Sequence, residues 1–112
     1  MSPYAHYTMR IIVDTKEKIP WKFDQLYNVE VMYRHLITGD YSIDGYENVL
    51  CIERKKSVLE IAVNITQKRF WNELVRMSKI KHRFIILEFP PSIALNNHRP
   101  AEQTRSALPL RL

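Results

Sequence analysis

The spacing of apolar residues changes at Ser57 from a pattern typical of strands to one typical of helices. Ser57 and Glu60 form an S-x-x-E capping box, which marks the start of a helix. The apolar residues that follow recur at helical spacing: Val58, Ile61, Ala62 and Ile65. After a polar break at 66–68, a second apolar set predicts another amphipathic helix: Phe70, Leu74 and Met77. A helix pair directly after a strand-rich half restricts the chain to a fold of mixed α and β structure.

Short runs of β-branched and aromatic residues predict the strands around these helices. The expected strands are 10–15, 30–36, 40–44, 49–55 and 82–89. We interpret 16–28 as a loop, because it contains Pro20 and no regular apolar period. Turn residues separate the strands within 30–55, which we interpret as a three-stranded antiparallel meander. The predicted fold is α/β, a three-layer fold with a central mixed β-sheet flanked by helices.

The composition favours one domain with an anionic partner. The chain has 112 residues, which we divide into an N-terminal extension at 1–9, a core at 10–90 and a tail at 91–112. A net charge of +5 favours nucleic acid or a membrane surface as partner. The single cysteine, Cys51, excludes an internal disulfide, and we expect it to be a buried small hydrophobe. No apolar run has the length of a membrane span or the pattern of a signal peptide, so we expect an intracellular protein of the cytoplasm, nucleoid or nucleus.

Two acids and a lysine occur where the last two strands of the expected meander meet. They are Asp40, Glu53 and Lys55. If the connecting loop is 45–48, Asp40 lies opposite Glu53, with Cβ atoms about 5 Å apart. The alternation of a strand then places Glu53 and Lys55 on one face and Arg54 on the other. A two-residue turn at 44–45 would instead leave Asp40 opposite Val49, and no site would form.

These residue types suit metal-dependent phosphodiester chemistry. Two neighbouring carboxylates can share one divalent cation, and Mg²⁺ or Mn²⁺ is the natural ion for such a site. The cation polarises a phosphate oxygen and lowers the pKa of a bound water, while the lysine orients or activates that water. The spacing Glu-x-Lys is common by chance, and a solvated, charged strand end is the alternative interpretation.

Four short segments of the sequence resemble, in the same order, motifs of the XPF and Hef family of structure-specific DNA nucleases. The nuclease domain of that family belongs to the restriction-endonuclease-like superfamily. The four segments are I-V-D-T-K-E at 12–17, G-D-Y at 39–41, I-E-R-K at 52–55 and R-F-x-x-E-L at 69–74. The resemblance implies a restriction-endonuclease-like fold and a divalent-metal-dependent endonuclease that uses Mg²⁺ or Mn²⁺. It implies cleavage of branched or flapped DNA near a single-strand to double-strand junction, in repair or recombination. A homodimer or heterodimer is a further implied partner arrangement, and no membrane partner is expected.

The resemblance also implies roles for single residues by motif position. Asp40 and Glu53 would be metal ligands and, together with the catalytic Lys55, would form the catalytic set. Asp14 would be a further metal-binding acid. Glu17 and Arg54 lie within the matched segments as accessory residues, and Arg54 would either bind phosphate or brace its strand.

Three departures separate this chain from the family pattern. Lys16 stands where the family usually has Arg, which keeps the charge and loses the bidentate fork. The family usually has an Asp four residues after the motif lysine. Here that position is Leu59, and Glu60 follows it, either as a replacement acid or as the helix cap. The tandem helix-hairpin-helix modules common in family members are not visible in the sequence.

Basic residues at the end of the 49–55 strand and on the second helix form a candidate DNA-binding surface. The candidates are Arg54, Lys56, Lys68, Arg69 and Arg76. A solvated helix face is the alternative interpretation of this stretch. The aromatic residues Trp21, Phe23, Tyr41 and Tyr46 would stack on splayed bases or, as we expect, pack in the core or loops. The alternative function is a catalytically inactive nuclease-like module that binds DNA or a nuclease partner, and a second alternative is a small basic domain that matches by accident.

Overall fold

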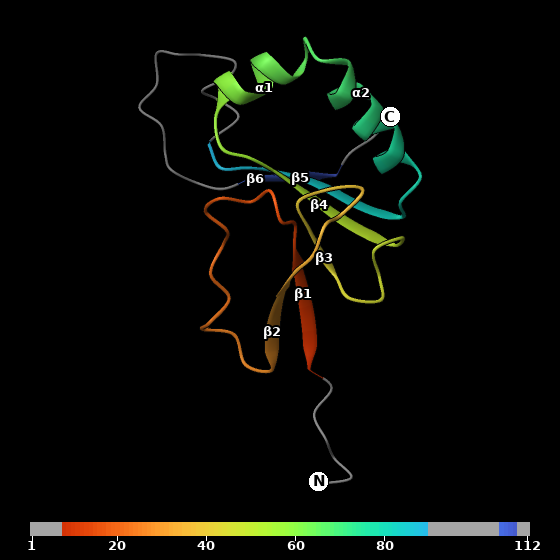
Figure 1. The fold of residues 1–112 in the computed structure, drawn as a ribbon. Coiled ribbons are helices and arrows are strands. Elements are labelled where there is room, and N and C mark those ends of the chain that lie inside the picture. The colour runs from red at the N-terminus through yellow and green to blue at the C-terminus, as the bar shows by residue number, and fades with distance from the viewer. Residues whose placement is uncertain (1–7, 90–105, 110–112) are drawn as a thin grey trace, which may run out of the picture.

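The structure, a computed structural model, describes residues 8–89 and 106–109 (Figure 1). In chain order the elements are β1 (Met9–Val13), β2 (Val29–Tyr33), β3 (Tyr41–Ile43), β4 (Leu50–Lys55), α1 (Val58–Asn64), α2 (Lys68–Ser78), β5 (His82–Leu87) and β6 (Ser106–Pro109). The expected strands and both expected helices are therefore confirmed, with ends that differ by a few residues.

The strands form one mixed sheet in the order β2-β1-β3-β4-β5-β6. β1 pairs in parallel with β2 and antiparallel with β3. β4 pairs antiparallel with β3 and in parallel with β5, and β5 pairs antiparallel with β6. The α/β fold with a central mixed sheet is confirmed.

The expected antiparallel meander over 30–55 is wrong in one part, because β2 does not pair with β3. β1 lies between them, and β2 occupies the sheet edge beside β1. The loop 14–28 is long enough for the crossover that parallel pairing needs. β1 takes the inner position because its Ile12 and Val13 are fully buried, whereas β2 exposes Glu30 and Tyr33 as an edge strand can.

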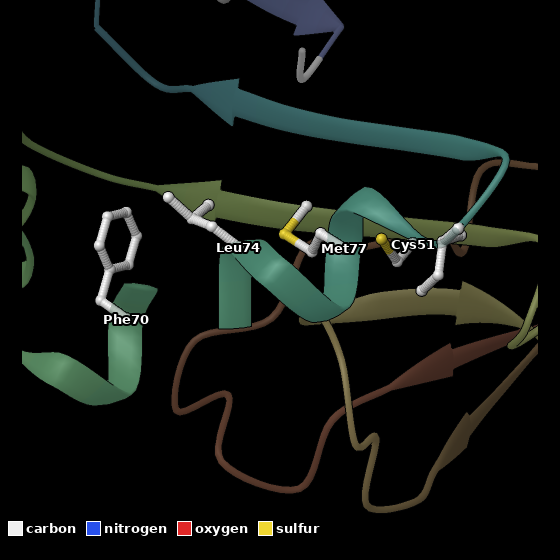
Figure 2. Packing of buried hydrophobic residues seen from close by; sticks show 5 residues of the cluster. Cys51, Phe70, Leu74 and Met77 are labelled. Carbon is white, nitrogen blue, oxygen red and sulfur yellow. The ribbon is translucent and has the colours of Figure 1, made fainter. Parts of the chain in front are cut away.

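Both helices lie over the same face of the sheet (Figure 1). The side chain of Ser57 accepts a hydrogen bond from the Glu60 amide at 3.1 Å, so the predicted cap of α1 is confirmed. α2 directs its apolar side toward β4, and the resulting core cluster comprises Cys51, Phe70, Leu74, Met77 and Ile80 (Figure 2). Cys51 is a buried small residue in this core, as expected, and the cluster fixes α2 along the strand that carries the candidate site.

The loop 14–28 covers the other face of the sheet. Trp21 stacks on Tyr41 with ring centroids 4.4 Å apart, and Phe23 meets the same ring edge-on at 6.1 Å. The Trp21 amide donates to the Tyr41 hydroxyl at 3.0 Å. These aromatic side chains therefore pack against the sheet, and Tyr46 is exposed. Helices, sheet and loop form three layers.

The C-terminal region adds a strand that the sequence pattern did not predict. β6 (Ser106–Pro109) pairs with β5 in the register Leu87↔Ser106 to Phe84↔Pro109. Residues 1–7, 90–105 and 110–112, which comprise most of the predicted extension and tail and the last residue of the predicted core, lie outside the described residues. No helix in the described part of the chain is long and apolar enough to cross a bilayer.

Candidate active site

The hairpin of β3 and β4 has the register that the site requires. Tyr41 pairs with Ile52, and extending the ladder by one residue places Asp40 opposite Glu53. The loop between the strands is the longer of the two alternatives, since the same register sets Asp44 opposite Val49. Gly39 precedes Asp40 with a φ of 82°, and a Cβ there would lie 3.1 Å from the Ile52 carbonyl oxygen. The turn thus needs glycine at this position.

Backbone hydrogen bonds hold Asp40 in place. Its amide donates to the Ile52 carbonyl at 2.8 Å, and its own carbonyl accepts from the Asp14 amide at 2.8 Å. Its carboxylate Oδ2 accepts from the Arg54 amide at 2.8 Å. The carboxylate therefore stays at the junction of β1, β3 and β4.

Asp40 and Glu53 are electrostatically coupled neighbours. Burial raises the pKa of Glu53 most, and the negative charges of Asp40 and Glu73 raise it further. Burial also raises the pKa of Asp40, to about 6, against the lowering effect of the Arg54 amide. Glu53 is 5% exposed, and its Oε1 has no hydrogen-bond partner among the described residues. Two acids share a space in which both cannot easily be charged.

Lys55 is held on the same face of β4 as Glu53. Its Nζ lies 3.1 Å from Glu53 Oε2 and donates to Asn64 Oδ1 on α1 at 2.7 Å. The ammonium also lies 5.0 Å from the centre of the Phe70 ring. At 5% exposure, Lys55 is fixed between the sheet and the helices, with its charge directed at the acidic pair.

The acidic pair has the donors that a hard divalent cation prefers. A buried carboxylate oxygen without a partner, beside a second carboxylate, fits Mg²⁺ or Mn²⁺. Mg²⁺ is usually bound by one or two carboxylates, with water and substrate phosphates as further ligands. No group of three or more His, Cys, Asp or Glu side chains within the described part of the chain has an arrangement that could hold a metal ion.

The sequence matches the ERCC4 domain over residues 13–109. The chain belongs to the ERCC4 domain family. This match begins at Val13, the last residue of β1, and includes the hairpin of the acidic pair, both helices, β5 and β6.

Two solved structures of XPF from Aeropyrum pernix are similar to this ERCC4 domain. One has 27% sequence identity and a TM-score of 0.56, and it covers 73% of this chain and 38% of its own. The other, a complex with DNA, has 28% identity and a TM-score of 0.56, and it covers 74% of this chain and 41% of its own. The chain thus spans less than half the length of these relatives. None of the curated proteins matches it.

Within this ERCC4 domain, Arg54 and Glu17 lie on the face of β4 opposite the acidic pair. The Arg54 guanidinium donates to Glu17 Oε2 at 3.1 Å, to the Ile19 carbonyl at 2.6 Å, and to Glu88. It also lies 5.1 Å from the Trp21 ring centre. Burial alone would lower the pKa of Arg54, but the hydrogen bonds to Glu88 and Glu17 outweigh it and raise the pKa. Of the two alternative roles, this placement favours bracing the strand.

Asp14 follows β1 directly, and its carboxylate accepts hydrogen bonds from two backbone amides. Oδ1 accepts from the Leu36 amide at 2.8 Å, and Oδ2 accepts from the Lys16 amide at 3.2 Å. His35 Nδ1 lies 3.5 Å from Oδ1. The structure therefore brings Asp40, Glu53 and Lys55 together, and it gives Asp14 backbone partners of its own.

Glu60 combines both alternatives proposed for it. Its Oε2 accepts from the Lys56 amide at 3.0 Å at the start of α1, and its Oε1 lies 3.9 Å from Lys55 Nζ. Leu59, at the position of the family's usual acid, is 71% exposed. The acid beside Lys55 thus comes from the residue after Leu59.

The predicted DNA-binding residues other than Arg54 are exposed: Lys56, Lys68, Arg69 and Arg76. Three of them lie on α2, whose buried side faces the sheet.

Two residues of the site were missed from the sequence. Asn64 holds Lys55, and Glu73 accepts from the Gly39 amide at 3.1 Å. Glu73 lies within the R-F-x-x-E-L segment, which is the signal that could have found it.

Proposed function

We propose that this ERCC4 domain is a divalent-metal-dependent endodeoxyribonuclease that cleaves phosphodiester bonds in branched or flapped DNA. The observation that carries this proposal is the coupled pair of Asp40 and Glu53, with an unpartnered buried oxygen on Glu53 and Lys55 beside it. A structural strand end would leave its acids solvated or fully paired. Asp40 and Glu53 are neither solvated nor fully paired, which supports a bound cation as their missing partner.

Asp40 and Glu53 would hold the cation, with Mg²⁺ or Mn²⁺ as the expected ion. When bound, the cation polarises a phosphate oxygen and lowers the pKa of a coordinated water. Asp40 is suited to this role because three backbone hydrogen bonds fix its position before any ligand arrives. Glu53 is suited because its free oxygen is already desolvated.

Lys55 would orient the attacking water and offset the negative charge that develops on the phosphate. Its ammonium lies 3.1 Å from Glu53, so it sits at the edge of the space where substrate and cation meet. Asn64 Oδ1 accepts a hydrogen bond from the ammonium, which fixes the direction of the lysine without adding a competing charge. The pair's charge and the lysine's charge then act on the same phosphate.

The DNA would lie across the helix side of the sheet. The exposed Lys68, Arg69 and Arg76 on α2 would contact phosphates. That one of the similar XPF structures is a complex with DNA supports DNA as the ligand. A junction-containing substrate and a dimeric arrangement, as in repair or recombination, are parts of the same proposal.

The test is a cleavage assay on flap, fork, splayed-arm and linear duplex DNA with Mg²⁺, Mn²⁺ or EDTA. The variants are Asp40→Asn and Lys55→Ala. The matched controls are Asp44→Asn, at the other end of the same strand, and Lys18→Ala, on the loop over the opposite face. We expect cleavage only with metal, preference for the junction substrates, and a loss of about 10²-fold or more in both site variants, since metal-assisted charge stabilisation contributes several kcal/mol. Both controls should keep wild-type rates.

If wild type binds junction DNA and cuts nothing in either metal, the domain is the non-catalytic module instead. If Asp40→Asn cuts at the wild-type rate, the chemistry lies elsewhere in the chain.

A further inference from the structure

Glu73 connects the second helix to the turn that carries Asp40. Its Oε1 accepts a hydrogen bond from the Gly39 amide at 3.1 Å, across 34 positions of sequence. The neighbouring Leu74 is buried against β4 together with Phe70, and Figure 2 shows these side chains directed at the strand. Packing of the helix thus fixes where the Glu73 carboxylate lies.

The charge of Glu73 acts on the acidic pair. Burial and the charge of Asp40 raise the pKa of Glu53 most, and Glu73 raises it further. Burial and then the charge of Glu17 raise the pKa of Asp40, and Glu73 adds a smaller increase. It is also a cause of the raised pKa of Cys51, after burial and Glu53. Lys55 is the cation in contact with Glu53. Three acids and one ammonium therefore share the junction of α2, β3 and β4.

A second observation indicates what this excess negative charge is for. Glu53 is 5% exposed, and its Oε1 lies at this junction without a hydrogen-bond partner among the described residues. An unpartnered buried carboxylate oxygen is costly unless a cation or donor occupies the space beside it. The Gly39 amide donates to Oε1 of Glu73, and no hydrogen bond joins Glu73 to the unpartnered Oε1 of Glu53.

We propose that Glu73 is a third acid of the metal site, which strengthens the binding of a hard divalent cation by its charge while its Oε1 remains on the Gly39 amide. It acts from outside the direct ligand shell, in agreement with the lack of a three-ligand arrangement in the described residues. This inference rests on the proposed function, because it assigns Glu73 to the same Asp40 and Glu53 site. The bland alternative is that Glu73 only anchors the turn.

Two substitutions distinguish the proposed effect of the Glu73 charge on the metal site from a role as turn anchor. Glu73→Gln removes the charge and keeps an oxygen acceptor for the Gly39 amide, whereas Glu73→Ala removes both. Glu47 supplies a matched control, because its Oε1 accepts from the amide of Gly45 at 2.6 Å, at the far end of the same hairpin. Glu47→Gln therefore removes one negative charge and keeps a glycine-amide acceptor at a different place.

The experiment is calorimetric titration of each purified protein with Mn²⁺, with thermal unfolding in EDTA and in Mn²⁺ as a second readout. We expect Glu73→Gln to weaken Mn²⁺ binding about tenfold, the scale typical of residues that act on a metal through its ligands. Its melting temperature in EDTA should equal or exceed that of wild type, because a like charge beside Asp40 and Glu53 is gone. Its Mn²⁺-induced increase in melting temperature should be smaller, and Glu47→Gln should bind Mn²⁺ within about twofold of wild type, since distant exposed charges are screened.

Unchanged Mn²⁺ affinity in Glu73→Gln, with weakening confined to Glu73→Ala, would make Glu73 a turn anchor and overturn the inference. A fall in melting temperature of Glu73→Gln in EDTA would overturn it also, because the charge would then stabilise the metal-free fold. In both cases wild type would still bind Mn²⁺ and cut DNA, so the proposed function would stand. If wild type binds no Mn²⁺ and cuts nothing, both fall together.

Discussion

The motif Glu53-Arg54-Lys55 places buried charges on both faces of β4. The face covered by the loop 14–28 (the loop face) and the face covered by α1 and α2 (the helix face) give these charges different partners. On the loop face, the Arg54 guanidinium has partners in Glu17, Glu88, a carbonyl and an aromatic ring. On the helix face, Glu53 has a free buried oxygen beside a second acid. A fully paired buried charge holds a fold together, whereas an under-neutralised pair of acids is suited to a cation. The loop face of β4 thus stabilises the fold, and the helix face carries the candidate metal site.

The largest expected effect on stability comes from removing the Arg54 ion pairs on the loop face. Arg54→Ala would remove the guanidinium from the largely buried Glu17 and Glu88, and removing one member of a buried ion pair typically costs about 3–5 kcal/mol. We expect a loss of that size in the free energy of unfolding, measured by urea titration in EDTA. Arg54→Lys should recover only part of it, because an ammonium cannot reproduce the guanidinium fork.

Arg34→Ala is the matched control for this prediction. Arg34 also pairs with two acids, Asp44 and Glu47, but its side chain is 43% exposed. Exposed pairs contribute about 0–1 kcal/mol, so the control should stay within that range. Equal losses in Arg54→Ala and Arg34→Ala would contradict the view that the loop face supports the fold.

The division between the two faces was predictable from the sequence. Strand alternation alone separates Arg54 from Glu53 and Lys55. The sequence left two turns open, and the register of the structure selects the loop 45–48, which sets Asp40 opposite Glu53. Local signals also predicted the cap at Ser57 and the apolar side of α2. These features depend on neighbours a few residues apart, which is the range that a sequence pattern reports.

The partners on each face were not predictable in the same way. Arg54 meets Glu88 only because β5 lies parallel to β4, and Glu73 meets Gly39 only because α2 packs along β4. The position of β2 beside β1 likewise depends on which sheet edge is free, and no residue in 30–36 signals it. Contacts of this kind arise from tertiary packing, which the local pattern does not contain.

The second prediction concerns the pH dependence of the helix face. Because the pKa of Glu53 is raised from 4.5 to about 9, the folded state binds more protons than the unfolded state between these values. The stability of the metal-free protein should therefore fall as the pH rises through this window. The fall should exceed about 1.4 kcal/mol, which is the equivalent of one pKa unit.

Glu53→Gln isolates this effect, since the amide does not titrate. The free energy of unfolding of wild type minus that of Glu53→Gln, measured in EDTA at pH 5.5, 7 and 8.5, should decrease steadily. Asp44→Asn, in which the lost acid is paired with Arg10 and Arg34, should show no such decrease. A flat difference for Glu53→Gln would mean that the acidic pair is already neutralised without metal.

A smaller effect is expected from Asn64, which positions Lys55 rather than touching the substrate. Hydrogen bonds to charged groups contribute about 1.5–3 kcal/mol, so Asn64→Ala should lower the cleavage rate about tenfold. Mn²⁺ affinity should not change, because Asp40 and Glu53 remain in place. Asn72→Ala, an exposed asparagine on α2, is the control and should keep full activity. A parallel loss of Mn²⁺ binding in Asn64→Ala would show that Asn64 supports the whole site and not the lysine alone.

The smallest effect tests whether DNA approaches the helix face at all. Arg69→Ala and Arg76→Ala should each weaken DNA binding a few-fold and reduce the slope of log affinity against log salt by about 0.9, the value for one lost phosphate contact. Lys18→Ala and Lys22→Ala remove equally exposed charges from the loop over the opposite face and should leave the slope unchanged. Because the same net charge is lost in every variant, a difference between the two sets can come only from where the charge lies. Equal slopes in both sets would mean that DNA is attracted to the whole basic domain and not to the face that carries the acidic pair.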